Sequence, residues 1–155
     1  MQLYFYDEKF KTDIEQYQIT EDQLRFTGKP QDCVRLSQED VDRYAIVAME
    51  ENQLVTYFDL HKNEGAKPYS NNKNAILIRA FSTDSRYLGK GYATKALKLL
   101  PDFVKEHFPE MDEMVLGVNL ANEAAQALYK KCGFIDEGER RMGPKGVLIV
   151  MSYYL

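Results

Sequence analysis

The stretch Arg86-Tyr-Leu-Gly-Lys-Gly-Tyr-Ala93 joins two segments of different character. The apolar run Ala75–Phe81 before it is typical of a buried strand, and Thr94–Leu100 after it has helical spacing. Glycines let the backbone approach a ligand closely, and the first N–H groups of a helix attract an anion. The stretch therefore predicts a phosphate-binding turn between a strand and a helix, although a plain tight connection has the same signature.

Length and composition indicate one ordinary folded domain, residues 1–155. Hydrophobic residues make up 45% of the chain and charged residues 28%, and the formal net charge is −4. This balance lacks the basic surface that nucleic-acid binding uses. The two cysteines, Cys33 and Cys132, lie far apart, so no metal site is expected. We expect a cytoplasmic location and no membrane association, because no signal peptide or membrane-spanning run stands out.

Outside the central stretch, the pattern alternates strands with helices. Tyr44–Met49 and Leu54–Leu60 flank the polar residues Glu50–Gln53, which predicts a β-hairpin. Further strands are expected at Leu3–Tyr6, Glu113–Val118, from Phe134 onward and at Val147–Leu155, and helices at Pro30–Gln38, from about Lys90, and at Asn122–Lys131. This order predicts an α/β or α+β fold with a single sheet packed by helices.

The second informative segment is the predicted helix Asn122–Lys131, which Gly133 ends. Helical spacing places Asn122 and Tyr129 next to each other at the border of its core face. The residues predicted for the core face itself are Ala121, Ala124, Leu128 and Cys132. One helix would thus present an amide near its start and a phenol two turns later.

These two segments resemble the GNAT superfamily of N-acetyltransferases. Ile78–Ala93 resembles the family's cofactor motif, a strand leading into [Gln/Arg]-x-x-Gly-x-[Gly/Ala]. Val118-Asn119, Asn122, Leu128-Tyr129 and Gly133-Phe134 resemble its second motif, and the hairpin Tyr44–Leu60 is similar to its central strands. The resemblance covers Tyr44–Leu155. It implies a mixed, mostly antiparallel central sheet flanked by helices, and transfer of an acetyl group from acetyl-CoA to a primary amine of a small molecule or peptide.

The resemblance also implies roles for individual residues. Backbone N–H groups of one run would hold the pyrophosphate of the cofactor: Leu88, Gly89, Lys90, Gly91, Tyr92 and Ala93. Phe81, Ser82 and Thr83 would lie beside the pantetheine arm, which Asn122 would also contact, although an Asn at a helix start is equally a cap. Leu88 is read at the position where the family usually has Arg or Gln, which predicts one side-chain donor fewer in the loop.

Tyr129 is the predicted catalytic residue, because a positioned phenol can protonate the CoA thiolate as it leaves. The general base is not identified: His61, Asp59 and Glu50 are candidates, and water can serve instead. Cys132 is read as a packing residue rather than a nucleophile.

Two alternatives stay open at this point. One is an acyl-CoA-binding module without turnover. The other, a dinucleotide-binding enzyme, is disfavoured because no third glycine follows Gly89 and Gly91 at the required spacing. A homodimer is also left open.

Overall fold

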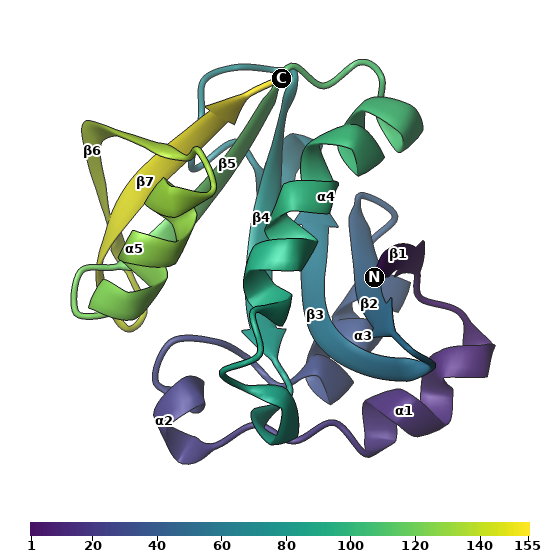
Figure 1. Ribbon diagram of the computed structural model, residues 1–155. Helices are drawn as coiled ribbons and strands as arrows, with labels where there is room; N and C mark the ends of the chain where they lie inside the picture. Colours follow the sequence, from purple (N-terminus) through teal and green to yellow (C-terminus); the bar gives the residue numbers. More distant parts are fainter.

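The computed structural model describes residues 1–155 (Figure 1). Its strands are β1 (Gln2–Phe5), β2 (Arg43–Glu50), β3 (Gln53–His61), β4 (Ala75–Thr83), β5 (Glu113–Asn119), β6 (Ile135–Gly143) and β7 (Gly146–Tyr154). Its helices are α1 (Lys11–Glu15), α2 (Glu21–Leu24), α3 (Pro30–Glu39), α4 (Tyr92–His107) and α5 (Glu123–Lys131), with short 3₁₀ turns at Glu8–Phe10, Asn63–Gly65 and Ser85–Tyr87.

The strands form one seven-stranded sheet in the order β1-β2-β3-β4-β5-β7-β6. Only β4 and β5 run parallel, and the other neighbours pair antiparallel. The predicted hairpin is β2–β3, and β1 lies at one edge as expected. The mixed, mostly antiparallel sheet expected from the sequence is confirmed.

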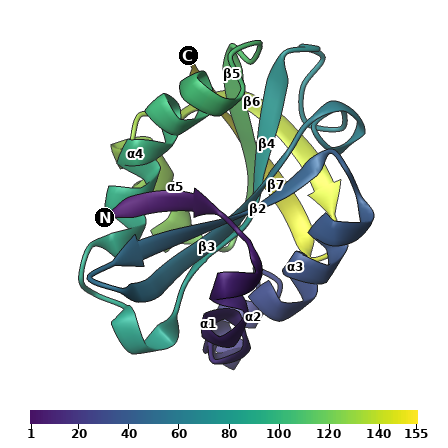
Figure 2. The ribbon, with the colours of Figure 1, turned by 90° about the vertical axis from the view of Figure 1, so that its right-hand side faces the viewer.

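Helices cover both faces of this sheet (Figure 2). On one face α4 buries Leu97, Leu100 and Val104 against the strands in the larger core, to which α5 contributes Tyr129. On the other face α1 and α3 pack against β2 and β3 in a smaller core. The alternation of side chains along each strand supplies apolar groups to both faces, which explains the continuous apolar run at Ala75–Ile78.

The sheet splits between β4 and β5. Their pairing covers only Ala75–Leu77 against Glu113–Val115, after which the two strands diverge (Figure 1). Ala80 has a positive φ of 55°, and the register of β4 with β3 shifts there, which is a β-bulge. The bulge and the divergence open the sheet at its middle, where the cleft described below lies.

The expected start of one helix needs correction. Helix α4 begins at Tyr92 rather than Lys90, because Gly91 precedes it with a positive φ. Pro101 lies inside α4, which continues to His107.

The predicted core face of α5 is wrong in part: Leu128 and Cys132 pack on the core as expected, but Ala121 and Ala124 are exposed. The face that packs into the core contains Ala125, Leu128, Tyr129 and Cys132. Alanines occur on both sides of this helix, so their spacing does not define a face. The large side chains of Leu128 and Tyr129 decide it.

Candidate active site

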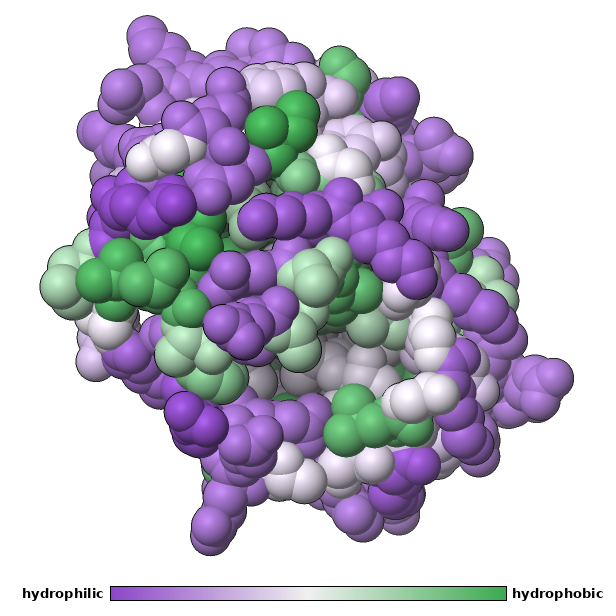
Figure 3. Space-filling model, turned by 60° about the vertical axis from the view of Figure 1, so that its left-hand side comes forward, coloured by the Kyte–Doolittle hydropathy of each residue, from purple (hydrophilic) through white to green (hydrophobic).

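A cleft of about 350 Å³ occupies the split between β4 and β5. Its walls come from β4, β5 and α5, from the turn before α4, and from α2 with the residues that follow it. The space-filling view shows a hollow surface in which apolar and weakly polar residues lie inside a hydrophilic rim (Figure 3). Residues of both motifs that the sequence singled out thus line one cavity, together with an N-terminal segment. From the stretch Arg86–Ala93 these are Leu88 and Ala93, whereas the residues from Gly89 to Tyr92 lie outside the lining.

The glycine-containing turn presents unpaired backbone donors. Gly89 and Gly91 both have φ of 78°, and a Cβ added at either would have no other atom within 4 Å. None of the amide N–H groups from Leu88 to Thr94 donates a hydrogen bond within the chain; the next one, Lys95 N–H, donates to Gly91 O at 3.1 Å. These donors surround the start of a 16-residue helix, an arrangement suited to a phosphate.

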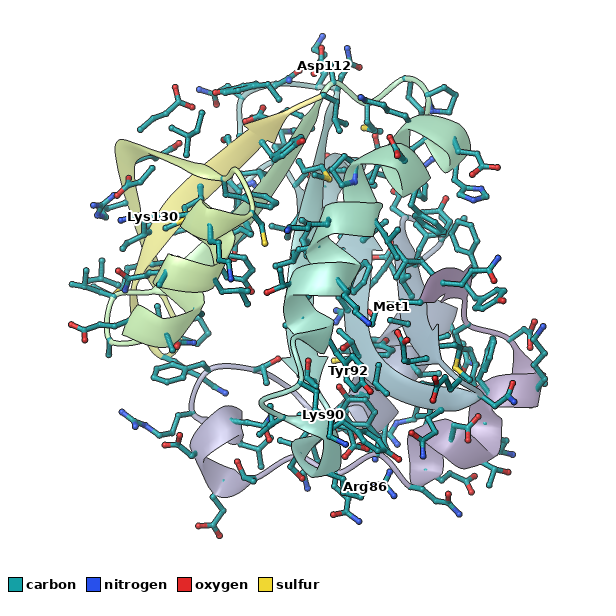
Figure 4. The ribbon with its side chains drawn as sticks, in the orientation of Figure 1. Met1, Arg86, Lys90, Tyr92, Asp112 and Lys130 are labelled. Carbon is teal, nitrogen blue, oxygen red and sulfur yellow. The ribbon has the colours of Figure 1, made fainter.

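Several positive side chains lie near the turn, among them Arg86 and Lys90 (Figure 4), and they differ in whether a carboxylate of the chain already binds them. Arg86 Nη2 lies 2.8 Å from Asp84 Oδ2, and the hydrogen bonds to this carboxylate raise the pKa of the guanidinium. Lys95 Nζ lies 3.6 Å from a Glu50 carboxylate oxygen. Lys90 makes no ion pair, so it is the cation of this turn that is left for a ligand.

The expectation of a missing donor at Leu88 is wrong. In the motif, Arg or Gln stands three residues before the first glycine, and counting back from Gly89 reaches Arg86. The family's usual residue type is therefore present, although its guanidinium is bonded to Asp84. Leu88 is about half exposed and lines the cleft.

The end of β4 is ordered by side chains from the N-terminal segment. Tyr17 Oη donates to Ser82 O at 2.8 Å and lies 2.9 Å from Ser82 Oγ. Gln23 Nε2 donates to Thr83 O at 2.8 Å. Phe81 packs its ring on Tyr129, with centroids 6.1 Å apart. All three predicted β4 residues line the cleft, and the sequence patterns did not indicate Tyr17 or Gln23 because their partners lie 60 or more residues away.

Tyr129 lies at the junction of the walls. Its ring is held in edge contacts with Phe81 and Phe134, and the residue lines the cleft. Burial raises the pKa of the phenol well above its usual value. The group therefore stays protonated at neutral pH, which is the state a proton donor needs.

Asn122 serves as the cap of α5 and also borders the cleft. Its side-chain oxygen accepts a hydrogen bond from Ala125 N–H at 3.2 Å. The residue lines the cleft, and its Nδ2 group has no partner within the chain. Asn119, by contrast, is used structurally: its Nδ2 donates to Lys145 O at 2.8 Å.

None of the three candidate bases lines the cleft. Asp59 is fully buried and lies 2.6 Å from Arg43 Nε, His61 Nε2 lies 3.0 Å from Asp40 Oδ2, and Glu50 faces the N-terminal amine at 3.3 Å. Asp22 is the carboxylate that does line the cleft.

Cys132 does not line the cleft. Its side chain packs on the core, and burial raises the pKa of its thiol, in line with a packing role. No His, Cys, Asp and Glu side chains gather as a set of metal ligands. No helix in the structure is both long enough and apolar enough to span a membrane.

Comparisons with known proteins give a consistent result. The model of the acetyltransferase (GNAT) family matches residues 5–134. An uncharacterized N-acetyltransferase of Bacillus subtilis (strain 168), YbbJ, is 38% identical over 154 residues, covering 99% of this chain and 96% of that protein.

Solved structures share the fold at low sequence identity. The aminoglycoside acetyltransferase AAC(6')-Ib, solved with paromomycin and acetyl-CoA, has a TM-score of 0.78 at 18% identity over 98% of this chain and 92% of that chain. The GNAT domain of S. lividans PAT has a TM-score of 0.72 at 14% identity over 99% of this chain and 89% of that chain.

Proposed function

This chain belongs to the GNAT acetyltransferase family and is an acetyl-CoA-dependent N-acetyltransferase, and we propose that it acetylates a primary amine of a small molecule or peptide by direct attack. AAC(6')-Ib, the fold neighbour solved with acetyl-CoA, acts on aminoglycosides, which supports a small amine as the acceptor class.

The observation that carries this proposal is the run of unpaired N–H groups from Leu88 to Thr94. Phosphate oxygens are matched acceptors for such donors, and the dipole of α4 adds to the attraction. The open space beside Gly89 and Gly91 admits a phosphate close to the backbone. The residues present therefore fit a CoA pyrophosphate, and bound acetyl-CoA supplies the activated thioester that the amine attacks.

The adjoining wall would hold the thioester. The backbone of Ile78–Thr83 has no strand partner on its β5 side beyond Leu77, so the polar groups on that side of the strand are left for a ligand in the cleft. The exceptions are the Ser82 and Thr83 carbonyls, which accept hydrogen bonds from Tyr17 and Gln23. An N–H group in the Phe81–Thr83 segment would polarise the acetyl carbonyl, and such stabilisation of developing charge is commonly a large contribution to catalysis.

Two proton movements complete the reaction. Tyr129 would donate its phenolic proton to the departing CoA sulfur, and its raised pKa means that this proton is present at neutral pH. The amine must lose a proton before attack, because an amine of pKa about 10.4 is less than ~0.1% neutral at pH 7. No buried base lines the cleft, so this proton would pass to water or to Asp22 at the rim.

A thiol-release assay tests the proposal. Purified protein would be mixed with acetyl-CoA and a panel of primary amines, and free CoA thiol measured with a chromogenic disulfide. We expect amine-dependent release that falls strongly in Tyr129→Phe. A silent acyl-CoA-binding module would instead bind acetyl-CoA in a calorimetric titration and release no thiol with any amine, and that result would refute the transferase role.

A further inference from the structure

The wall of the cleft away from the phosphate turn differs in chemistry from the rest. We call this the acceptor wall; it consists of Asp22 on α2, Phe26 and Thr27 just after that helix, Arg79 on β4 and Gly117 on β5. Its position follows from the proposed function, because the amine must reach the thioester from the side that the cofactor leaves open. The inference below rests on that function.

Arg79 is held in place from behind. Its Nη1 lies 3.2 Å from His61 Nδ1, and His61 Nε2 lies 3.0 Å from Asp40 Oδ2. Because a guanidinium only donates hydrogen bonds, Nδ1 must accept, which fixes a neutral histidine that donates from Nε2 to Asp40. Burial and the neighbouring Arg79 lower the pKa of His61, in agreement with this neutral form.

The remaining N–H groups of Arg79 are free for a ligand. The side chain makes no ion pair, and His61 is its only hydrogen-bond partner within the chain. The residue is exposed and lines the cleft. A guanidinium that is oriented on one side and free on the other is suited to binding a carboxylate or phosphate.

Two further cations lie near the acceptor wall. The Arg141 guanidinium lies 4.8 Å from the ring centroid of Tyr69, and that ring covers Gly117, where a Cβ would come within 2.8 Å of it. Arg141 Nε is buried without a hydrogen-bond partner. Lys145 Nζ donates to Leu24 O at 2.7 Å, at the end of α2.

Few carboxylates line the cleft at this wall; the buried Asp59, which interacts with the charge of Arg79, is paired with Arg43 and lies outside the lining. Asp22 is the one carboxylate that lines the cleft, and it lies 3.3 Å from Arg25 Nη1. The chain as a whole carries a net charge of −4, so this local excess of cations runs against the overall balance. A polycationic acceptor would need several carboxylates, which this wall does not provide.

We infer that the acceptor is an amine that also carries an anionic group, a carboxylate or a phosphate, and that Arg79 binds this group. The amine would then lie toward the thioester, and the anion toward Arg79. Thr27 Oγ1, which is buried without a partner on the same wall, is positioned to donate a further hydrogen bond.

The test compares matched acceptors that differ in the anionic group. The carboxylate pair is β-alanine and 3-aminopropanamide, the phosphate pair is phosphoethanolamine and ethanolamine, and kanamycin represents polycations. Wild type would be compared with Arg79→Gln and with Arg35→Gln, an exposed arginine on α3 that pairs with Asp32 away from the cleft. Thiol release gives kcat/KM for each acceptor.

We expect the anionic member of at least one pair to be preferred by about tenfold or more, since hydrogen bonds to charged groups contribute about 1.5–3 kcal/mol. The pair with the larger preference identifies the anion. Arg79→Gln should bring that pair close to parity, whereas Arg35→Gln should keep the preference. Arg79→Lys, which retains the charge but not the planar fork, should keep part of it.

Three results would overturn the inference: equal use of both members of each pair, a preference for kanamycin, or a preference that survives Arg79→Gln. Each of these results requires turnover of at least one amine; turnover of no amine by a protein that binds acetyl-CoA would instead refute the transferase role itself, and the inference with it. Calorimetry with acetyl-CoA separates these results from a failure of the proposed function. If wild type does not bind acetyl-CoA, the transferase proposal fails first. If Arg79→Gln binds it normally, the variant is folded.

Discussion

The two ends of the cleft are built in different ways. At the phosphate turn, consecutive residues from Leu88 to Thr94 present backbone N–H groups, so the binding chemistry depends little on side chains. At the acceptor wall, side chains such as Asp22, Arg79 and Thr27 come from distant parts of the chain. The cofactor end can therefore stay constant while the acceptor end changes one side chain at a time.

The largest effect is expected where the two ends meet. Replacing Tyr129 by Phe removes the proposed proton donor, and kcat should fall by about 10²–10⁴-fold. Acetyl-CoA affinity should stay unchanged, because the phenol acts in the chemical step. Steady-state thiol release and calorimetry measure the two quantities.

The matched control is Tyr153→Phe, whose ring lies 5.5 Å from that of Phe134 and does not line the cleft. Loss of activity to the same extent in both variants would show that the Tyr129 effect is structural.

The next effect tests the phosphate turn alone. Gly91→Glu places a side chain at a φ of 78°, which costs about 1–2 kcal/mol for a non-glycine residue. It also places a negative charge where phosphate would bind, so acetyl-CoA affinity should fall by roughly thirtyfold, given that charge–dipole interactions at helix ends contribute up to ~2 kcal/mol. Calorimetric titration measures the loss.

Gly138→Glu is the control for strain and charge. Gly138 has a φ of 93° on β6, and a Cβ there would also meet no atom within 4 Å. This variant should be destabilised to a similar degree and should bind acetyl-CoA normally. Equal weakening of acetyl-CoA binding in Gly91→Glu and Gly138→Glu would contradict the assignment of the turn as the phosphate site.

A smaller effect tests the acceptor wall. Gln23 Nε2 ties α2 to Thr83 O and also closes the capping box with Thr20. Gln23→Ala should loosen this segment and raise the KM for the acceptor by about fivefold, as the loss of a hydrogen bond of about 1 kcal/mol implies. The control is Gln18→Ala, because the Gln18 side chain makes no hydrogen bond within the chain, and this variant should leave the KM unchanged. An unchanged KM in both variants would exclude α2 from acceptor binding.

Asn122 allows capping to be separated from cofactor binding. Asn122→Ala should lower the free energy of unfolding by about 1 kcal/mol, whereas Asn122→Ser should keep most of it, because Ser also caps helices well. Both variants lack the free Nδ2 group and should bind acetyl-CoA a few times more weakly. If Asn122→Ser binds acetyl-CoA as tightly as wild type does, Asn122 acts only as a helix cap. Denaturant unfolding and calorimetry provide the two measurements.

The last prediction is that the ionisation of Tyr129 causes no change in kcat over the accessible pH range. Because burial raises the pKa of Tyr129, the phenol is protonated below its ordinary pKa of about 10 and is lost as a donor only when pH rises through the higher value. The kcat profile should therefore show no descending limb from Tyr129 between pH 7 and 10. A descending limb near pH 8 that Tyr129→Phe abolishes would contradict this assignment.

The sequence predicted the cofactor end because its signal is local. Gly89, Gly91 and the helix after them lie within a few residues, and the buried strand Ala75–Phe81 precedes them directly. The hairpin and the α3 helix were predicted for the same reason. The predicted core face of α5 was wrong in part, because alanines occur on both sides of that helix.

The acceptor wall could not be predicted from local patterns. The Gln23–Thr83 and Lys145–Leu24 hydrogen bonds join residues 60 and 121 positions apart. The bulge at Ala80, which aims the end of β4, carries no glycine to mark it. His61 was considered as a base, and its actual contact, Arg79, depends on the register of β3 with β4.

We propose that the backbone of the turn binds the cofactor, and that Arg79 selects the acceptor and has no part in cofactor binding. One calorimetric series tests this proposal most directly, with acetyl-CoA titrated into wild type, Gly91→Glu and Arg79→Gln. We expect binding to wild type, strongly weakened binding to Gly91→Glu and unchanged affinity in Arg79→Gln. Normal binding by Gly91→Glu, or equal weakening in both variants, would contradict the proposal.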